Sequence, residues 1–402
     1  MKKRIAFIVN TLSNGGAEKT VSNLSRMLSD QYDIDIVVNN MEHIDYPYKG
    51  NIISLGLPAD RERMKTTYQV YAIMRRIQVL RQLKKSREYA AVISFSEMTN
   101  LSNVLSGNKY SKTMISVRCA VKKRKDFGGR QKLVLSLVLP YVCRRADRTV
   151  SCSREIEEDL INHYGLAAGK SAVIYNGLDL EEIRKKSEEP LECEEPTHSG
   201  EKLIVSVGRI TYQKGQWHLL RAIKKLSDDG IPVRLLILGD GELRTALEKQ
   251  AVQLGISDRV RMPGFVENPY RYMAQADVFV MSSLYEGFSN AILEALACGV
   301  PVISTDHETG AREILAPETD YRAKTRTYID KASYGILVPV CNGSPDAADQ
   351  LSEEETTLSD AIRSIITNEN LTKHYREAAI ARAEQMDIHS VCRQWIRLIE
   401  GE

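Results

Sequence analysis

Short apolar runs alternate with helical patterns along the whole chain, and this alternation limits the folds that are open to it. Between several of the runs lie amphipathic stretches with helical spacing, such as residues 17–30 and 154–165. Strands separated by helices form parallel sheets that are covered on both faces. The runs that we interpret as strands are RIAFIV, DIDIVV, AAVISF, KTMISV, RTVSCS, SAVIYN, LIVSVGR, PVRLLILG, RVRMPGF, ADVFVMS and PVISTD.

One charged stretch with two prolines, EEIRKKSEEPLECEEPTHSG, separates the two series of strands. It predicts an N-terminal domain over 1–180, a linker over 181–200 and a C-terminal domain over 201–385. The last segment, 386–402, is amphipathic, and we expect a helix that crosses back to the N-terminal domain. The predicted fold is α/β, with two doubly wound Rossmann-like domains facing a central cleft, where ligands bind beyond the carboxyl ends of the strands.

Composition narrows the class of protein. The 402 residues are 43% hydrophobic and 27% charged, which is ordinary for a soluble protein. The apolar stretch near the N-terminus, residues 5–9, is too short for a signal peptide. Seven scattered cysteines without metal-ligand spacing predict reduced thiols in the cytoplasm and no metal site.

Positive charge is concentrated in the first part of the chain. Residues 1–180 carry 29 Lys and Arg against 17 Asp and Glu, whereas the remaining residues carry 26 against 36. Two basic stretches, 61–87 and 118–148, account for the excess, and apolar residues are interleaved with the charges. Two interpretations stay open: solvated helix faces, or a surface for anionic lipid headgroups or a polyphosphate acceptor.

Two acids, Glu286 and Glu294, lie in the segment MSSLYEGFSNAILEALACGVPVISTD. The loop MSSLYEGFSN follows a strand, Ser289 is a candidate N-cap, and a helix is expected from Asn290 until Gly299. Backbone N–H groups at this helix start are suited to an anion or to sugar hydroxyls. From spacing alone, Glu294 either accepts hydrogen bonds from a polyol or pairs with a lysine or arginine.

The E-x7-E spacing of Glu286 and Glu294, followed by EALACGVPVIST, resembles the retaining glycosyltransferases of family 4, which adopt the GT-B fold. Other segments agree with this resemblance, which covers nearly the whole chain. They are TLSNGGAEKTVSNLS, VGRITYQKG, LLILGDGELRTALEKQA and RVRMPGFVENPYRYMAQADVFVMSS.

The resemblance implies a role for each donor-side residue. Arg209 and Lys214 would hold the donor diphosphate and stabilise the leaving group. Surface salt bridging is the alternative for two cations, but it is disfavoured because both lie directly after the carboxyl end of a strand. Glu294 would accept hydrogen bonds from the ribose. Around the sugar, the resemblance implies Glu286 with Gly287, Phe288, Ser289 and Asn290. Around the ribose and base, it implies Gly239, Gly241, Phe265 and Val266. Tight turns are an equally good explanation of Gly239 and Gly241.

On the acceptor side, Gly15 and Gly16 precede a helix and allow backbone to approach a phosphate closely. Some family members carry a histidine in the loop after the strand 113–117, where this chain has Arg118. Arg118 is therefore a candidate catalytic residue beside Glu286, Arg209 and Lys214, and Asn100 is a candidate acceptor contact.

The implied function is retaining transfer of a sugar from a nucleotide diphosphate sugar, UDP-linked in most such enzymes, to a lipid-linked or oligosaccharide acceptor. In family terms this builds a capsule, O-antigen or other surface polysaccharide in the cytoplasm, at the inner face of the plasma membrane. We expect neither a cofactor nor a metal.

Functions of two other classes fit part of the sequence. A nicotinamide-dependent dehydrogenase would need a glycine fingerprint followed by an acid, which is missing. A non-catalytic nucleotide- or nucleic-acid-binding protein that uses the basic half remains the alternative. No nucleic acid is expected, because no recognised binding motif accompanies the charge.

Overall fold

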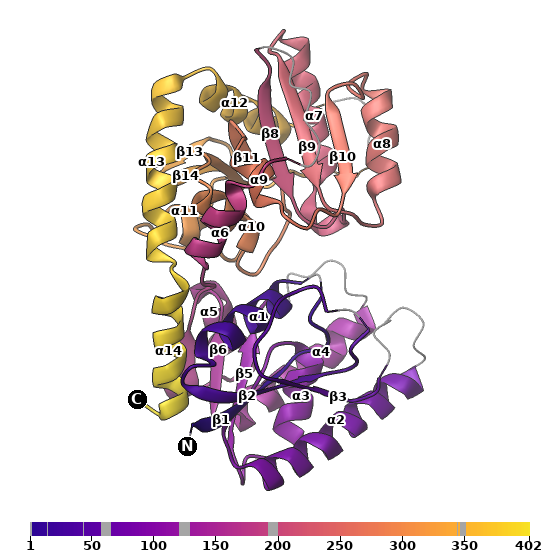
Figure 1. Cartoon of the computed structure of the whole chain (residues 1–402). Helices are drawn as coiled ribbons and strands as arrows, with labels where there is room; N and C mark the ends of the chain where they lie inside the picture. Colours follow the sequence, from indigo (N-terminus) through magenta and orange to yellow (C-terminus); the bar gives the residue numbers. More distant parts are fainter. Residues whose placement is uncertain are drawn as a thin grey trace. The chain divides into compact units, whose positions relative to one another are not determined.

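The computed structural model describes residues 2–13, 15–42, 44–57, 66–119, 129–191, 200–343, 345 and 351–402. The chain forms two compact units, each built on its own sheet (Figure 1). The N-terminal unit comprises Met1–Gly177 and Ile388–Glu402, and the C-terminal unit comprises Leu178–Asp387. Each unit is a doubly wound α/β layer structure, as the alternation of apolar runs predicts.

The sheet of the N-terminal unit has seven strands in the order β3-β2-β1-β4-β5-β6-β7, and all of its pairings are parallel. The last four residues of β1 and five of the six residues of β4 are buried, which explains their continuous apolar runs. The strands are β1 (Lys3–Ile8), β2 (Tyr32–Val38), β3 (Asn51–Ser54), β4 (Tyr89–Ser94), β5 (Lys112–Val117), β6 (Arg148–Ser151) and β7 (Ser171–Val173).

Helices cover both faces of this sheet. Buried residues of α1 and α14 pack with β1, β2 and β4 in one core cluster, and α2, α3 and α4 contribute to separate clusters with other residues of the same strands and of β5. The helices are α1 (Gly16–Leu28), α2 (Thr66–Arg87), α3 (Glu97–Leu105), α4 (Gly129–Arg145), α5 (Arg154–Tyr164) and α14 (Ile388–Glu400).

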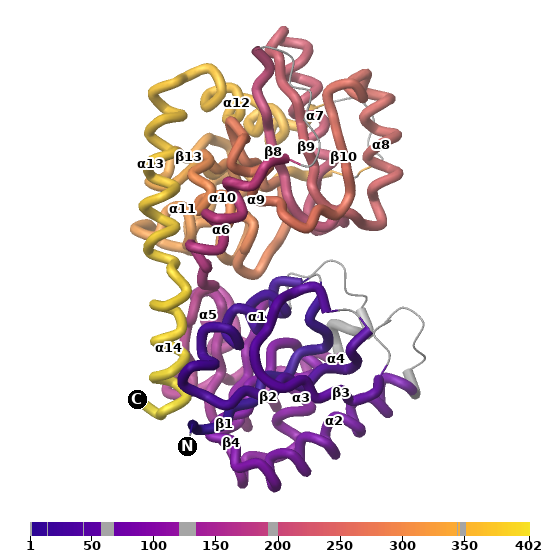
Figure 2. Tube along the Cα trace, in the orientation of Figure 1, coloured from indigo at the N-terminus to yellow at the C-terminus, as the bar shows by residue number. Residues whose placement is uncertain are grey.

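The C-terminal helix α14 is part of the N-terminal unit. Figure 2 shows its yellow trace beside the indigo segments that contain β1 and α1. Trp395 is 1% exposed and lies against Phe95, with ring centroids 5.8 Å apart. Five buried residues of α14 join the core of this unit, so the helix is as much a part of that core as α1 is.

The sheet of the C-terminal unit has the order β10-β9-β8-β11-β12-β14-β13, in which only the edge strand β13 is antiparallel. Its strands are β8 (Lys202–Val207), β9 (Val233–Leu238), β10 (Val260–Gly264), β11 (Val278–Met281), β12 (Val302–Thr305), β13 (Asp330–Ala332) and β14 (Gly335–Val338). Its helices are α6 (Leu180–Ser187), α7 (Gln216–Asp228), α8 (Arg244–Gln253), α9 (Tyr270–Met273), α10 (Asn290–Ala297), α11 (Ala311–Leu315), α12 (Glu353–Ile366) and α13 (Glu369–Gln385).

The expected linker over 181–200 differs from the structure. Asp179 caps α6 by accepting a hydrogen bond from the backbone N–H of Glu182, and Ile183 is buried. The helix packs on α9 and α10, so this part of the chain belongs to the C-terminal unit. The charged composition that suggested a linker reflects an amphipathic helix with a single buried residue. Residues 192–199 of the predicted linker lie outside the described residues.

No helix of the described part of the chain has the length and apolar content that a membrane crossing requires.

Candidate functional site

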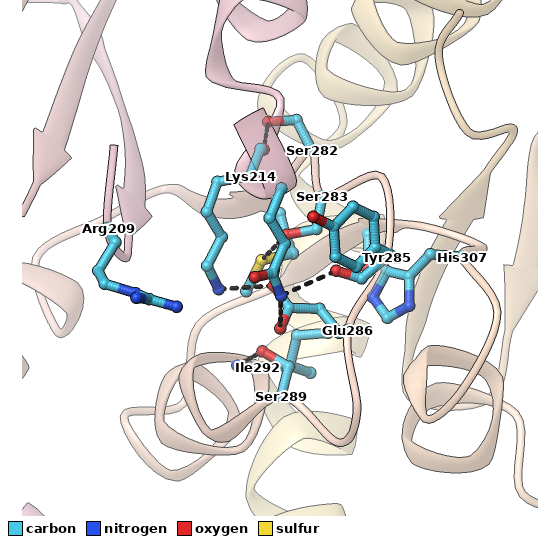
Figure 3. Close-up of polar contacts among 12 residues, drawn as sticks. Arg209, Lys214, Ser282, Ser283, Tyr285, Glu286, Ser289, Ile292 and His307 are labelled. Carbon is cyan, nitrogen blue, oxygen red and sulfur yellow. Dashed lines mark hydrogen bonds and ion pairs between the residues drawn. The ribbon is translucent and has the colours of Figure 1, made fainter. Parts of the chain in front are cut away.

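Three loops meet at the carboxyl edge of the C-terminal sheet, where β8, β11 and β12 lie side by side. The loop after β8 carries Arg209 and Lys214, the loop after β11 carries Glu286, and the loop after β12 carries His307 (Figure 3). Because the carboxyl ends of parallel strands meet at one edge, residues far apart in sequence converge there.

The first two loops are joined by backbone contacts that need a glycine. Gly215 has φ +60°, and a Cβ there would lie 2.6 Å from the carbonyl oxygen of Ser282. The hydroxyl of Ser282 donates to the carbonyl of Lys214 at 3.0 Å, and the N–H of Leu284 donates to the carbonyl of Gln213 at 2.8 Å. This close approach places the side chain of Lys214 against the loop that contains Glu286.

The carboxylate of Glu286 accepts three hydrogen bonds. Its Oε1 lies 2.6 Å from Nζ of Lys214 and 2.8 Å from the hydroxyl of Ser283, and its Oε2 accepts from the amide of Gln213 at 3.0 Å. The side chains of Lys214 and Glu286 are only 15% and 10% exposed, so the ion pair is largely shielded from water.

The pKa of Glu286 lies below its ordinary value. Burial alone would raise it, but the positive charge of Lys214 and the hydrogen bonds from Lys214 and Ser283 together outweigh burial. Glu286 is therefore an ionised hydrogen-bond acceptor at neutral pH and is unsuited to donate a proton.

Arg209 is exposed, and its guanidinium has no hydrogen-bond or ion-pair partner among the residues that the structure describes. In Figure 3 it is directed toward Lys214, and no interaction is drawn to it. A cation without a partner, beside a second cation that is already paired, provides positive charge for an incoming anion.

The third loop holds the second loop in place. The hydroxyl of Thr305 donates to the carbonyl of Ser283 at 2.5 Å, and the hydroxyl of Thr309 donates to the carbonyl of Glu286. Thr309 has φ +69°, an unfavourable conformation for a β-branched residue. Such strain clusters at functional sites, where the surrounding contacts enforce it.

His307 is fully buried in this loop. Its Nδ1 faces the carbonyl of Glu308 at 3.2 Å, whereas its Nε2 is buried without a hydrogen-bond partner in the described part of the chain. Burial lowers the pKa of the imidazole and outweighs the opposing effect of the Glu286 carboxylate, so the ring is neutral at pH 7. With the proton on Nδ1, Nε2 is an acceptor.

Glu294 lies on the second turn of α10 and is 6% exposed. Ser289 caps this helix, because its side chain accepts from the N–H of Ile292. Phe288 is buried against the third loop, where Gly310 approaches it. The expected sugar-contact loop thus leads into α10, and the expected ribose acid lies on the second turn of the same helix.

Gly239 and Gly241 are explained by close backbone approach. A Cβ on Gly239 would lie 2.1 Å from the carbonyl oxygen of Gly208, and one on Gly241 would lie 2.3 Å from that of Ile210. The loops after β8 and β9 can therefore meet only because both residues are glycine. Phe265, on the loop that follows β10, is 66% exposed.

The acceptor-side candidates lie in the N-terminal unit, at the carboxyl edge of its sheet. Arg118 follows β5 and donates to the hydroxyl of Thr20 at 2.8 Å and to the side-chain oxygen of Asn176. Burial lowers the pKa of Arg118. The amide of Asn100 donates to the carbonyl of Ser116 at 2.9 Å, while its buried Oδ1 has no partner among the described residues.

Gly15 is the N-cap of α1, and Gly16 is its first residue. No side chain caps this helix, and the carboxylate of Glu18 lies where a Cβ on Gly15 would be. Each of the two units carries its own set of candidate residues.

Sequence reasoning missed Gln213, Ser283, His307 and Thr309. Gln213 and Ser283 lie within quoted motifs and His307 directly follows a predicted strand, and these positions were the available signal. Thr309 had no such signal. Among the described residues, no group of three or more His, Cys, Asp or Glu side chains is arranged to hold a metal ion.

Two Rossmann-like sheets, the second with the cations Arg209 and Lys214 at its carboxyl edge, are typical of GT-B glycosyltransferases. Residues 14–182 match the family described as Glycosyltransferase Family 4, and residues 188–333 match Glycosyl transferases group 1. A glycosyltransferase of Methanocaldococcus jannaschii is 30% identical over 343 residues, which are 84% of this chain and 83% of that protein. The chain belongs to the family 4 glycosyltransferases.

Another relative, from Campylobacter jejuni, is 26% identical over 408 residues, covering 99% of this chain and 100% of that protein. It is named N-acetylgalactosamine-N,N'-diacetylbacillosaminyl-diphospho-undecaprenol 4-alpha-N-acetylgalactosaminyltransferase.

Solved structures share the fold over the whole chain. Sucrose-phosphate synthase of Thermosynechococcus elongatus has a TM-score of 0.77 at 17% identity, covering 100% of this chain and 99% of that one. Anabaena HepE in complex with UDP has a TM-score of 0.73 at 16% identity, covering 99% and 100%. The predicted fold class is confirmed.

Proposed function

We propose that the chain transfers a hexose from a UDP-linked sugar to a hydroxyl of a lipid-linked glycan, with retention of the anomeric configuration. The buried ion pair between Lys214 and Glu286, with the unpaired Arg209 beside it, is the observation that carries the proposal. Uridine is proposed as the base because most enzymes that share these motifs use UDP-linked donors.

In this proposal, Arg209 and Lys214 bind the donor diphosphate. Their charges offset the negative charge that develops on the departing nucleotide, which is a stabilisation specific to the transition state. Since two cations from the protein meet this need, we propose that the reaction requires no metal ion and no other cofactor.

Glu286 binds the sugar rather than attacking it. A carboxylate that already accepts from Lys214, Ser283 and Gln213 is a weak nucleophile, but it has room for one further hydroxyl donor. The N–H groups of Gly287, Phe288 and Ser289 are proposed as further sugar contacts, and Glu294 as the acceptor for the ribose hydroxyls.

Retention then follows from a same-face displacement. The bond between the anomeric carbon and the diphosphate oxygen breaks, and the acceptor oxygen bonds to the same face of the sugar. The acceptor proton passes to the departing phosphate oxygen, so no enzyme base is needed. Arg118, with Asn100, Gly15 and Gly16, is proposed to position the acceptor.

The acceptor class is proposed from relatives. The Campylobacter enzyme is named for a diphospho-undecaprenol acceptor. A Rhizobium meliloti relative, 43% identical over 106 residues, is named as a lipopolysaccharide core biosynthesis glycosyltransferase. We accordingly propose that this chain builds a surface polysaccharide, such as a capsule or O-antigen, at the inner face of the plasma membrane.

Incubation of the protein with radiolabelled UDP-sugars and a bacterial lipid extract tests this proposal. We expect label in the lipid fraction in the presence of EDTA, and an α-linkage from an α-linked donor. Replacing Arg209 by Ala should lower the rate by about 10²-fold or more. The control is Arg259→Ala, at the opposite edge of the same sheet. A β-linked product or a strict metal requirement would refute those parts of the proposal.

A further inference from the structure

Two helices of the N-terminal unit, α2 and α4, expose large apolar side chains. Single exposed apolar residues are common on soluble proteins, but a group on neighbouring elements indicates a contact surface. The six residues, with their exposed fractions, are Val70 (51%), Tyr71 (56%) and Met74 (65%) on α2, and Val134 (51%), Leu137 (69%) and Tyr141 (39%) on α4.

These residues lie on one side of the unit. Both α2 and α4 pack on the short helix α3, and the three helices form one layer over the sheet (Figure 1). No residue of α3 is exposed, so the outer side of this layer consists mainly of α2 and α4. Ala72 and Leu80 of α2, and Leu135 and Leu139 of α4, are buried, and therefore the exposed residues occupy the opposite faces of these helices.

Not every cation of α2 is available to a partner. Arg76 donates to the side-chain oxygens of Asn39 and Asn10, and Lys84 donates to the carbonyls of Asn103 and Gly107. Both side chains are buried and serve the fold. Among the side chains of the two helices that the structure describes, the exposed cations are Arg75, Arg81 and Lys85 of α2, with Arg144 and Arg145 of α4.

The charge of this surface has one sign. Residues 66–87 and 129–145 contain no Asp or Glu, although more than a quarter of the chain is charged. Exposed apolar groups on helices whose only charged side chains are cations are suited to the interface of an anionic bilayer, where the apolar groups enter the acyl boundary and the cations meet the headgroups. Nucleic acid would use the cations but would leave Val70, Met74 and Leu137 without a role.

We propose that this α2–α4 surface docks the chain on a bilayer that contains anionic lipids. This proposal rests on the proposed function, because docking on a bilayer is useful to an enzyme whose lipid-linked acceptor lies in that bilayer. In a parallel α/β layer the helices run opposite to the strands, so the amino-terminal halves of α2 and α4 lie at the carboxyl edge of the sheet. Val70, Tyr71 and Met74 lie in this half of α2. Val134 lies in this half of α4, Leu137 is at its middle, and Tyr141 is one turn further on. Most of the apolar group is therefore near the same edge as Arg118 and the start of α1. Docking therefore brings the acceptor-side candidates to the lipid surface.

Sedimentation with phosphatidylcholine vesicles, with and without phosphatidylglycerol, tests the docking. We expect binding only when phosphatidylglycerol is present, and weaker binding as salt is added. The double variant Met74→Glu/Leu137→Glu should lower binding about tenfold or more. The matched control Val252→Glu/Ile380→Glu changes equally exposed residues of the C-terminal unit, 67% and 52% exposed, and should bind like wild type.

Arg75→Glu separates the contribution of charge, because Arg75 is exposed and adjoins Met74 on α2, and it should lower binding by a similar factor. Circular dichroism and UDP binding should be unchanged in every variant, so a failure of nucleotide binding would count against the proposed function and not against docking. Any of three results would overturn the proposal. The wild type could bind vesicles equally with and without phosphatidylglycerol, the variant Met74→Glu/Leu137→Glu could bind like wild type, or duplex DNA could compete fully with the vesicles.

Discussion

Replacing Lys214 by Met should destabilise the C-terminal unit, and more so at neutral than at acidic pH. The change removes the ammonium group from the Glu286 carboxylate but keeps the length of the side chain. Breaking a fully buried ion pair costs about 3–5 kcal/mol. Because the two side chains are 15% and 10% exposed, and because Ser283 and Gln213 still donate, we expect about 2–3 kcal/mol.

The pH dependence follows from the pKa of Glu286. In the wild type this pKa is lowered, so its stabilising contribution is present at neutral pH and is lost as the pH falls through the folded-state value. Without Lys214, burial raises the pKa of Glu286 above that of the unfolded chain, and the variant loses stability as the pH rises. The difference in unfolding free energy should therefore grow between about pH 5 and about pH 7.5.

Differential scanning calorimetry at both pH values measures the effect, and about 2–3 kcal/mol corresponds to a fall in Tm of roughly 4–12 °C for a unit of this size. The control is Lys202→Met, which breaks the more exposed pair with Asp277 at 3.1 Å and should cost less than about 1 kcal/mol. Lys214→Met/Glu286→Gln, which removes both charges, should recover most of the loss. A penalty for Lys214→Met that is equal at both pH values would refute the reasoning.

Three further outcomes are expected. Gly310→Ala should lower the free energy of unfolding in urea by about 2 kcal/mol or more, because φ is +91° and a Cβ would lie 2.7 Å from the carbonyl of Gly287. The control is Gly255→Ala, with φ +67° and open space around it, which should lower the free energy of unfolding by about 1 kcal/mol. His307→Gln should reduce the loss of stability below about pH 6.5, because the lowered pKa of His307 makes the unfolded chain bind more protons there; an unchanged pH profile would contradict this. Trp395→Ala should destabilise the N-terminal unit by about 3–5 kcal/mol and leave UDP binding unchanged.

Much of the fold could be predicted from the pattern of apolar runs, because buried parallel strands are continuous apolar segments. Three strands are absent from the predicted runs. β3 has four residues, none of them fully buried, and β13 is a three-residue edge strand with one buried residue, so neither has a strong apolar signal. β14 was missed although its four residues, GILV, are all buried. The segment that includes α6 has one buried residue and the composition of a linker, and only its packing on α9 and α10 assigns it to the second unit.

For the site, the rule that strands end at one edge could predict that Arg209, Lys214 and Glu286 lie near one another. The pairing of Lys214 with Glu286 could not be predicted, because it depends on the left-handed conformation of Gly215 and its approach to Ser282. His307 carries no motif of its own. Its importance appears only when burial and the unpartnered Nε2 are known.

We propose that the carboxyl edge of the second sheet binds a uridine nucleotide, with Glu294 at the ribose. Isothermal titration of UDP into the wild type, Glu294→Gln and the exposed control Glu384→Gln, with EDTA present, tests it most directly. We predict that the wild type and the control bind UDP equally. Glu294→Gln should bind about tenfold more weakly or worse, since hydrogen bonds to a charged acceptor contribute about 1.5–3 kcal/mol. No UDP binding by the wild type, or equal binding by all three proteins, would contradict the claim.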